Sequence, residues 1–205
     1  MITDKLLIKK LTFPPLDERE ALRYAGIRVA TDEHISLIRS SLDELSLYLQ
    51  NVVIYKILKV STGGGVCNFG SFSVRSEKLA NELVDAEYAA IICATLGVGV
   101  DRIIAKYSRT SPSRAHIVNA VATERIEALL DEFETKLKRD VSKEKYELCS
   151  RFSPGYGDFA LTEQKNIFNL LTPNKYIGLT LNNSLIMSPS KSVSAIIGIK
   201  KRKPK

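Results

Sequence analysis

The sequence contains no tryptophan, only two histidines and three cysteines, and no long apolar run. Cys67, Cys93 and Cys149 are odd in number and widely spaced, with no C-x-x-C pair, which predicts reduced thiols rather than a disulfide framework. No apolar run reaches the ~18 residues that a membrane-spanning helix needs, and charges interrupt residues 1–11 too often for a signal peptide. These absences predict a cytoplasmic protein without a membrane partner.

Motifs for metals and phosphates are also missing. His34 and His116 each lack a second metal ligand nearby in sequence, so we expect no metal site. The glycines at 63–65 lack the G-K-[ST] ending of a phosphate loop, and 97–99 (GVG) is followed by Arg102 where a dinucleotide loop needs its third glycine. No cysteine has an evident base partner for nucleophilic catalysis. Catalytic residues therefore stay unassigned.

The positive charge is concentrated at one end of the chain. The formal net charge is +7, from 30 basic and 23 acidic residues, and five of the basic residues lie in the last six positions. The remainder carries 25 basic and 23 acidic residues, a difference of +2. We expect residues 200–205 to form a disordered basic tail. Because the body is nearly balanced and poor in aromatics, we expect no nucleic-acid groove, and an RNA-associated function would rest on the tail alone.

The apolar pattern predicts an α+β fold. Helical spacing is found over 16–24, 32–49, a segment capped by Ser76 that runs to Val84, 162–171, and a long helix at about 112–138 that begins after Ser111. Strand-like runs occupy 52–60, 88–96, 177–181, 185–187 and 192–199, and a charged linker occupies 140–147. Without regular βαβ alternation, this order favours a single domain with a mixed, largely antiparallel sheet flanked by helices.

The segment 151–158 (RFSPGYGD) combines several residues that suit a ligand. Arg151 can hold a carboxylate through two parallel hydrogen bonds. Pro154 and Gly155 fix a turn whose backbone can approach a flat ligand closely. The ring of Tyr156 can contact an adenine or a sulfonium cation. Taken alone, the same residues also fit an ordinary turn.

Several ordered motifs make this chain resemble a known domain. The R-x-x-P-G-Y element is followed by 167–171 (IFNLL), 177–181 (IGLTL) and 187–194 (MSPSKSVS). Together they resemble the S-adenosylmethionine-binding activation domain of vitamin B12-dependent methionine synthase, in a stand-alone form. The resemblance covers an activation-domain-like core at 86–199. Residues 1–85, the N-terminal helical and strand part of the same domain, match loosely, chiefly at 23–26 (RYAG).

The resemblance implies a binding site. By position, S-adenosylmethionine would contact Arg151, Ser153, Pro154, Gly155 and Tyr156, together with Glu127 on the long helix. An alternative reading makes Glu127 part of a solvated face, which it shares with Glu124, Asp131 and Glu134. The family's Leu-Thr-Glu-Ser is replaced by 181–184 (LNNS), an amide for a carboxylate. An aspartate that binds the ligand's amino group in the family has no assigned counterpart.

The resemblance also implies a reaction. The chain would bind S-adenosylmethionine and support reductive methylation, or reactivation, of cob(II)alamin held by a partner methionine synthase subunit. Because no Asp-x-His-x-x-Gly corrinoid motif or flavin motif is present, cobalamin would be bound by the partner, and electrons would come from a flavodoxin-like or ferredoxin-like donor. The alternative is a non-catalytic S-adenosylmethionine-binding regulatory or interaction subunit of another corrinoid methyltransferase system.

Overall fold

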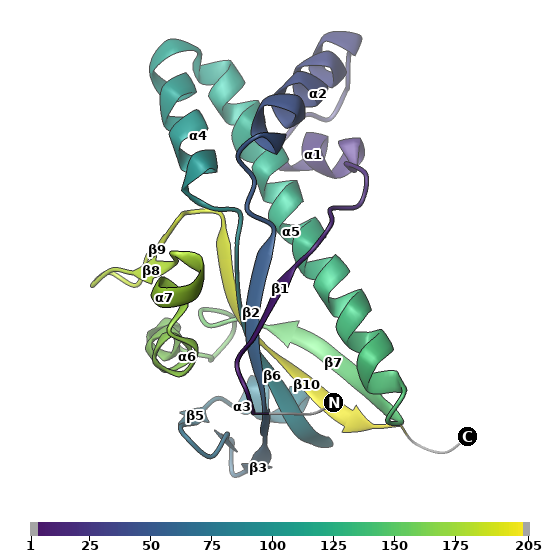
Figure 1. Cartoon of the computed structure of the whole chain (residues 1–205), viewed down its shortest axis with the longest axis vertical. Helices are drawn as coiled ribbons and strands as arrows, with labels where there is room; N and C mark the ends of the chain where they lie inside the picture. The colour runs from purple at the N-terminus through teal and green to yellow at the C-terminus, as the bar shows by residue number, and fades with distance from the viewer. Residues whose placement is uncertain (1–3, 203–205) are drawn as a thin grey trace.

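The computed structural model describes residues 4–202. One end of the molecule is formed by helices alone, the other contains a β-sheet with further short helices beside it, and the long helix α5 (Pro112–Ser142) runs through both (Figure 1). The predicted long helix at 112–138 is therefore confirmed and continues for four more residues. No helix in the described range is both long and apolar enough to cross a membrane.

The large sheet is antiparallel throughout, with the strand order β1-β2-β6-β10-β7. Its members in chain order are β1 (Leu7–Lys10), β2 (Val52–Lys59), β6 (Ala86–Thr95), β7 (Tyr146–Phe152) and β10 (Ser192–Lys201). The central strand β6 is almost wholly apolar because both of its faces are buried. The α+β class and the largely antiparallel sheet are thus confirmed.

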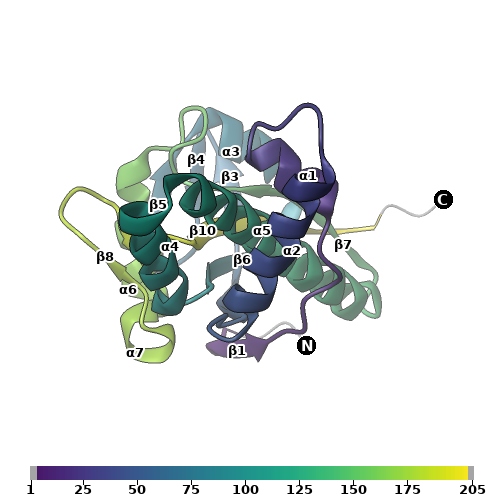
Figure 2. The ribbon, with the colours of Figure 1, turned by 90° about the horizontal axis from the view of Figure 1, so that it is seen from above.

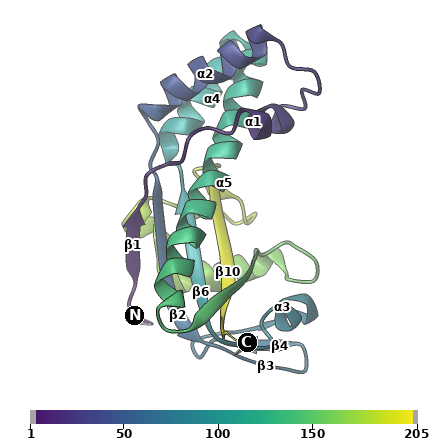
Figure 3. The same ribbon diagram turned by 90° about the vertical axis from the view of Figure 1, so that its right-hand side faces the viewer.

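The two faces of the sheet carry different covers. Helix α5 packs along one face, where its apolar stripe meets alternate residues of β6 such as Ile92 and Ala94 (Figure 3). The intervening residues of β6, such as Ile91 and Cys93, enter a second cluster on the other face. The elements that contribute side chains to this second cluster are β4 (Val66–Asn68), β5 (Ser73–Arg75), α3 (Glu77–Glu82), α6 (Gln164–Leu171), α7 (Pro173–Ile177) and β9 (Met187–Ser188). Three short elements adjoin them: β3 (Ser61–Gly63) pairs with β4, the 3-10 turn η1 (Leu161–Glu163) precedes α6, and β8 (Thr180–Leu181) pairs with β9.

Three helices surround the N-terminal half of α5, as seen from above in Figure 2. They are α1 (Glu18–Tyr24), α2 (Asp32–Ser46) and α4 (Val98–Thr110). Side chains cap two of them: the Asp17 carboxylate accepts from the first turn of α1, and Thr31 forms a capping box with His34 at the start of α2. The GVG segment at 97–99 begins α4, so it is a helix start rather than a dinucleotide loop.

A buried ion pair on α5 ties the N-terminal segment to this helix. Glu124 and Arg125 pair with each other, and their side chains are only 6% and 3% exposed. Arg125 also donates to the carbonyl oxygens of Pro14 and Pro15 at 2.8 and 3.2 Å, and Glu124 accepts from the backbone N–H of Asp17 at 3.1 Å. Glu124 is therefore not part of a solvated face.

Two expectations about chain segments are wrong. The charged linker at 140–147 is the end of α5 and the start of β7, separated by a turn in which Lys145 has φ +64°. Strand β7 lacks a clear apolar pattern because it is a half-buried edge strand. In 177–181, α7 ends at Ile177 and only the last two residues form a strand.

The expected disorder of the 200–205 tail is also wrong for its first two residues. Lys200 and Lys201 belong to β10 and pair with β7. Their ammonium groups lie 3.6 Å from Glu147 and 2.9 Å from Glu87. Residues 203–205 lie outside the described range.

Candidate ligand-binding cleft

A cleft opens where β7 ends before its neighbour does. The last registered pair between the two strands is Phe152 with Ile196, whereas β10 stays paired with β6 as far as Ser192. The chain leaves the sheet after Phe152, and a cleft of about 480 Å³ lies at this point. Its lining residues are Glu127, Arg151, Phe152, Ser153, Pro154, Tyr156, Gln164, Met187, Ser192, Val193 and Ser194.

One end of the cleft is charged. Arg151 Nη2 donates to Glu127 Oε2 at 2.8 Å, and Arg151 Nη1 lies 3.2 Å from Glu134 Oε1. Glu127 and Glu134 are seven residues apart on α5, so both point from the same face of the helix. Although Glu134 is near, the buried Nη1 makes no aligned hydrogen bond within residues 4–202. Burial raises the pKa of Glu134, and the Arg151 charge opposes that rise.

The loop after β7 is folded by its own backbone. Gly155 has φ +94°, a conformation that side chains disfavour, and its N–H donates to the carbonyl oxygen of Phe159 at 2.7 Å. The Tyr156 N–H donates to the carbonyl oxygen of Ser153 at 3.2 Å. Phe159 is buried and stacks on Phe152 with ring centroids 6.0 Å apart. This packing leaves the Tyr156 side chain 69% exposed at the cleft.

A carboxylate fastens the end of this loop to α3. Asp158 accepts from Ser76 Oγ at 2.6 Å and from the backbone N–H of Glu77 at 2.7 Å, at the N-terminus of the helix. The Ser76 hydrogen bond, followed by the backbone donors of Glu77 and Lys78, lowers the pKa of Asp158 despite partial desolvation. Ser76 also caps α3 as predicted, since its Oγ accepts from the N–H of Leu79. The loop that carries Tyr156 is therefore held at both ends.

The other end of the cleft is polar but uncharged. Gln164, the first residue of α6, is 5% exposed, and Ser194 on β10 is 2% exposed. Neither Gln164 Oε1 nor Ser194 Oγ has a hydrogen-bond partner in the described part of the chain. By contrast, Ser192 Oγ is engaged with Thr95 Oγ1 and the carbonyl oxygen of Pro189, both at 2.8 Å.

The structure brings most of the expected site residues together. Glu127, Arg151, Ser153, Pro154 and Tyr156 all line the cleft, whereas Gly155 shapes the loop without lining it.

Sequence reasoning missed four polar residues of the cleft region: Glu134, Gln164, Ser192 and Ser194. The seven-residue spacing from Glu127 was a usable signal for Glu134, but nothing in the sequence distinguished Gln164 from a surface amide. The LNNS departure lies outside the cleft lining, at the turn between β8 and β9, where Asn182 Oδ1 accepts from the N–H of Ile186 at 2.9 Å.

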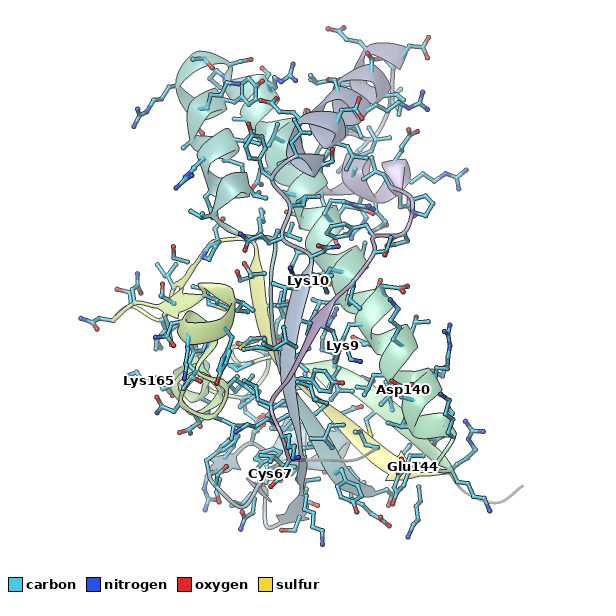
Figure 4. The ribbon with its side chains drawn as sticks, viewed as in Figure 1. Lys9, Lys10, Cys67, Asp140, Glu144 and Lys165 are labelled. Atoms are coloured by element: carbon cyan, nitrogen blue, oxygen red, sulfur yellow. The ribbon has the colours of Figure 1, made fainter. Side chains whose placement is uncertain are left out.

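Other candidate chemistry lies away from this cleft. A larger hollow of about 1160 Å³ at the opposite end of β2 and β6 includes Glu87 and Tyr146 but none of the expected site residues. Within residues 4–202, no three histidine, cysteine or acidic side chains gather to hold a metal ion. The cysteines are free; Cys67, labelled in Figure 4, is buried, and burial raises the pKa of its thiol to about 11.

Comparison with known proteins defines the class of fold and then the family. The chain resembles a crystal structure of the MetH reactivation domain bound to AdoHcy, with a TM-score of 0.70 and 15% identity, over 100% of this chain and 82% of that chain. The fold is therefore that of a reactivation domain. The family model for the activation domain of vitamin B12-dependent methionine synthase matches residues 79–203, more than half of the sequence, and the chain belongs to this family. No curated protein matches.

Proposed function

We propose that this chain binds S-adenosylmethionine in the cleft at the end of β7 and supports reductive methylation of cob(II)alamin held by a partner methionine synthase. The observation that carries the proposal is the convergence of the R-x-x-P-G-Y loop with Glu127 on a single cleft, in a member of the activation-domain family. The AdoHcy bound to the related MetH domain supports the same ligand class.

The charges of the cleft fit this ligand. S-adenosylmethionine carries one carboxylate, one ammonium and one sulfonium, a net charge of +1. Arg151, Glu127 and Glu134 together carry −1 when ionised. Arg151 keeps a buried donor without an aligned partner in the described residues, so it can donate to the ligand carboxylate and still keep its hydrogen bond to Glu127. The carboxylates of α5 then face the cationic groups.

The chain's part in the reaction is to hold and orient. When bound, S-adenosylmethionine supplies an electrophilic sulfonium methyl group for the reduced cobalamin of the partner. Methyl transfer from a sulfonium releases no proton, so no residue here needs to act as a base. The ring of Tyr156 lies exposed at the cleft, where its face can stabilise the sulfonium and meet the incoming partner. The anchored loop fixes the direction of the methyl group.

The proposal also includes a cobalamin-bearing partner, an electron donor for it and a cytoplasmic location. A cobalamin-bearing subunit has to approach the Tyr156 side of the cleft, and a flavodoxin-like or ferredoxin-like protein has to reduce its cobalt. The alternative, a non-catalytic binding subunit of another corrinoid system, predicts ligand binding without turnover. A methylation assay with reduced, cobalamin-loaded methionine synthase separates the two, because only a reactivation subunit yields methylcobalamin and S-adenosylhomocysteine.

Calorimetric titration of S-adenosylmethionine tests the binding site itself. Arg151→Ala removes a charge-assisted contact worth ~1.5–3 kcal/mol, so the affinity should fall roughly ten- to a hundredfold. Arg109→Ala, at an exposed position at the end of α4, is the matched control and should bind as the wild type does. A folded wild-type protein that takes up no ligand, or an Arg151→Ala variant with undiminished affinity, would refute the proposal.

A further inference from the structure

The neutral end of the cleft contains an unsatisfied amide and an unsatisfied hydroxyl. Gln164 Oε1 and Ser194 Oγ are buried, line the same cleft, and lack hydrogen-bond partners within residues 4–202. A buried polar group without a partner is destabilising, so folded proteins seldom retain one unless a bound water or a ligand engages it. Two such groups in one cleft indicate a polar ligand group that both donates and accepts hydrogen bonds.

The strand register places these groups across the sheet from the charged end. Arg151 is paired with Ile197, whose side chain belongs to the cluster beneath α5. Ile196 belongs to the opposite cluster, and Ser194, two residues earlier on the same strand, shares its face. The cleft therefore passes around the open edge of β10, from the carboxylates of α5 to the side chain of Gln164 on α6.

We propose that Gln164 and Ser194 recognise the adenine base of the ligand, a specificity that rests on the proposed function. A carboxamide offers one acceptor beside one donor, which matches the 6-amino group and N7 of adenine. The ribose and the amino-acid part offer no such planar pair, and the amino-acid charges are matched at the opposite end. Phe152, Pro154 and Met187 line the same cleft and supply the apolar contacts that a flat base needs.

The direction of the ligand follows from this assignment. The base lies against α6, the amino-acid part lies against α5, and the sulfonium lies between them near the Tyr156 loop. This orientation places the methyl group at the open edge of the sheet, where the partner can reach it. Ser194, with a single hydroxyl, contributes a secondary contact to the base.

The test compares two ligands on three proteins. The ligands are S-adenosylhomocysteine and S-inosylhomocysteine, which differ in that a carbonyl oxygen replaces the 6-amino group. The wild type should prefer the adenine ligand by about five- to a hundredfold, because oxygen and N7 together present two acceptors to the amide. Gln164→Met should lose most of the affinity for S-adenosylhomocysteine and most of this preference.

Lys165→Met is the matched control, since it places the same side chain at the next, exposed position of α6 (Figure 4). It should keep both the affinity and the preference of the wild type. Arg151→Ala should weaken both ligands by the same factor, because it acts on the amino-acid part that they share. Ser194→Ala should reduce the preference less than Gln164→Met does.

The outcomes distinguish a wrong adenine assignment from a wrong proposed function. If the wild type binds S-adenosylhomocysteine but shows no preference over the inosine ligand, or if Gln164→Met keeps the full preference, the adenine assignment is wrong and the proposed function stands. If the wild type binds neither S-adenosylmethionine nor S-adenosylhomocysteine, both fall together. The wild-type comparison decides the matter even if Gln164→Met fails to fold.

Discussion

Two arginine–carboxylate clusters involve helix α5, and they differ in how completely their hydrogen bonds are satisfied. Arg125 lies on α5 itself, whereas Arg151 lies on β7 and reaches the carboxylates of α5. Around Arg125, the paired carboxylate of Glu124 and two proline carbonyl oxygens take up the guanidinium donors, and the whole group is buried. Around Arg151, the side chains of Glu127 and Glu134 are 39% and 28% exposed, and one guanidinium nitrogen lacks an aligned partner in the described residues.

This difference fits a structural role for the first cluster and the proposed binding role for the second. A closed cluster has no remaining donor or acceptor for a ligand, and its partners lie far apart in sequence, so it fixes the chain. An open cluster retains hydrogen-bonding capacity and lines a cleft. The carboxylates of one helix therefore pair with two arginines in different ways, and only the Arg151 cluster keeps an unsatisfied donor within the described residues.

Replacing each arginine by methionine should give the largest difference between the two clusters, measured as the free energy of unfolding. Arg125→Met leaves Glu124 buried without its counter-charge and should lower the free energy of unfolding by about 3–5 kcal/mol. Arg151→Met breaks a partly exposed cluster and should lower it by about 1 kcal/mol or less. Urea unfolding of both variants measures the two losses.

Ligand binding should rank the same variants in the opposite order. Below its unfolding transition, Arg125→Met should bind S-adenosylmethionine as the wild type does, whereas Arg151→Met should not. Equal losses of stability in the two variants would show that the clusters are not distinct. The double variant Glu124→Leu/Arg125→Met serves as a control, because removing both charges should restore part of the lost stability.

A smaller effect on ligand affinity tests whether the carboxylates of the open cluster attract the cationic ligand. Glu127→Gln removes one of the two carboxylates that face the cationic ligand. It should weaken binding of S-adenosylmethionine relative to S-adenosylhomocysteine by roughly two- to fivefold, as expected for a partly exposed charge pair. Paired calorimetric titrations give the ratio. A ratio equal to that of the wild type would mean that Glu127 does not sense the sulfonium.

The sequence allowed more of the fold to be predicted than of the site. Periodicity located α5 and the central strands because their burial on one or two faces dictates the pattern of apolar residues. It missed β7, whose half-buried edge position removes that pattern, and this is the strand that carries Arg151.

The composition of the cleft depends on register, which no local pattern encodes. Arg151 and the RFSPGYGD loop were identifiable because glycine, proline and arginine have specific backbone or charge properties. Ser194 enters the cleft only because β7 stops at Phe152, and Gln164 only because α6 begins beside the open edge. Similarly, the sequence does not distinguish Glu124 from its acidic neighbours, because its burial depends on contact with the distant N-terminal segment.

The Asp158 carboxylate, close in sequence to Arg151, has its hydrogen bonds satisfied by Ser76 and Glu77, and its ionisation can be tested by varying the pH. Its lowered pKa means that the folded state holds its proton less tightly than the unfolded state does. The stabilisation that it provides is therefore complete above the unfolded pKa and is lost as the pH falls through the lower folded value. Asp158→Asn should unfold at a lower temperature than the wild type at pH 7, and this difference should shrink in acid.

The same variant should weaken S-adenosylmethionine binding by a few-fold, because the loop that carries Tyr156 is no longer held on α3. Thermal melting across a pH series and calorimetry provide the two measurements. A destabilisation that stayed constant down to strongly acidic pH would argue against the anchoring role of the carboxylate.

The smallest expected effect concerns the ionisation of Glu134 in the open cluster. Burial raises its pKa, and the charge of Arg151 lowers it. The folded value therefore lies above the ordinary 4.5, so the contribution of this group to stability is present in acid and is lost as the pH rises through the folded pKa. Arg151→Ala removes the opposing charge and should raise the pKa of Glu134 further. Carbon-detected NMR titration of the side-chain carboxyl follows this change directly.

Arg125→Met is the control for this titration. Because Arg125 belongs to the closed cluster, this variant should leave the pKa of Glu134 at its wild-type value. A shift in that pKa would mean that the two clusters are electrostatically coupled.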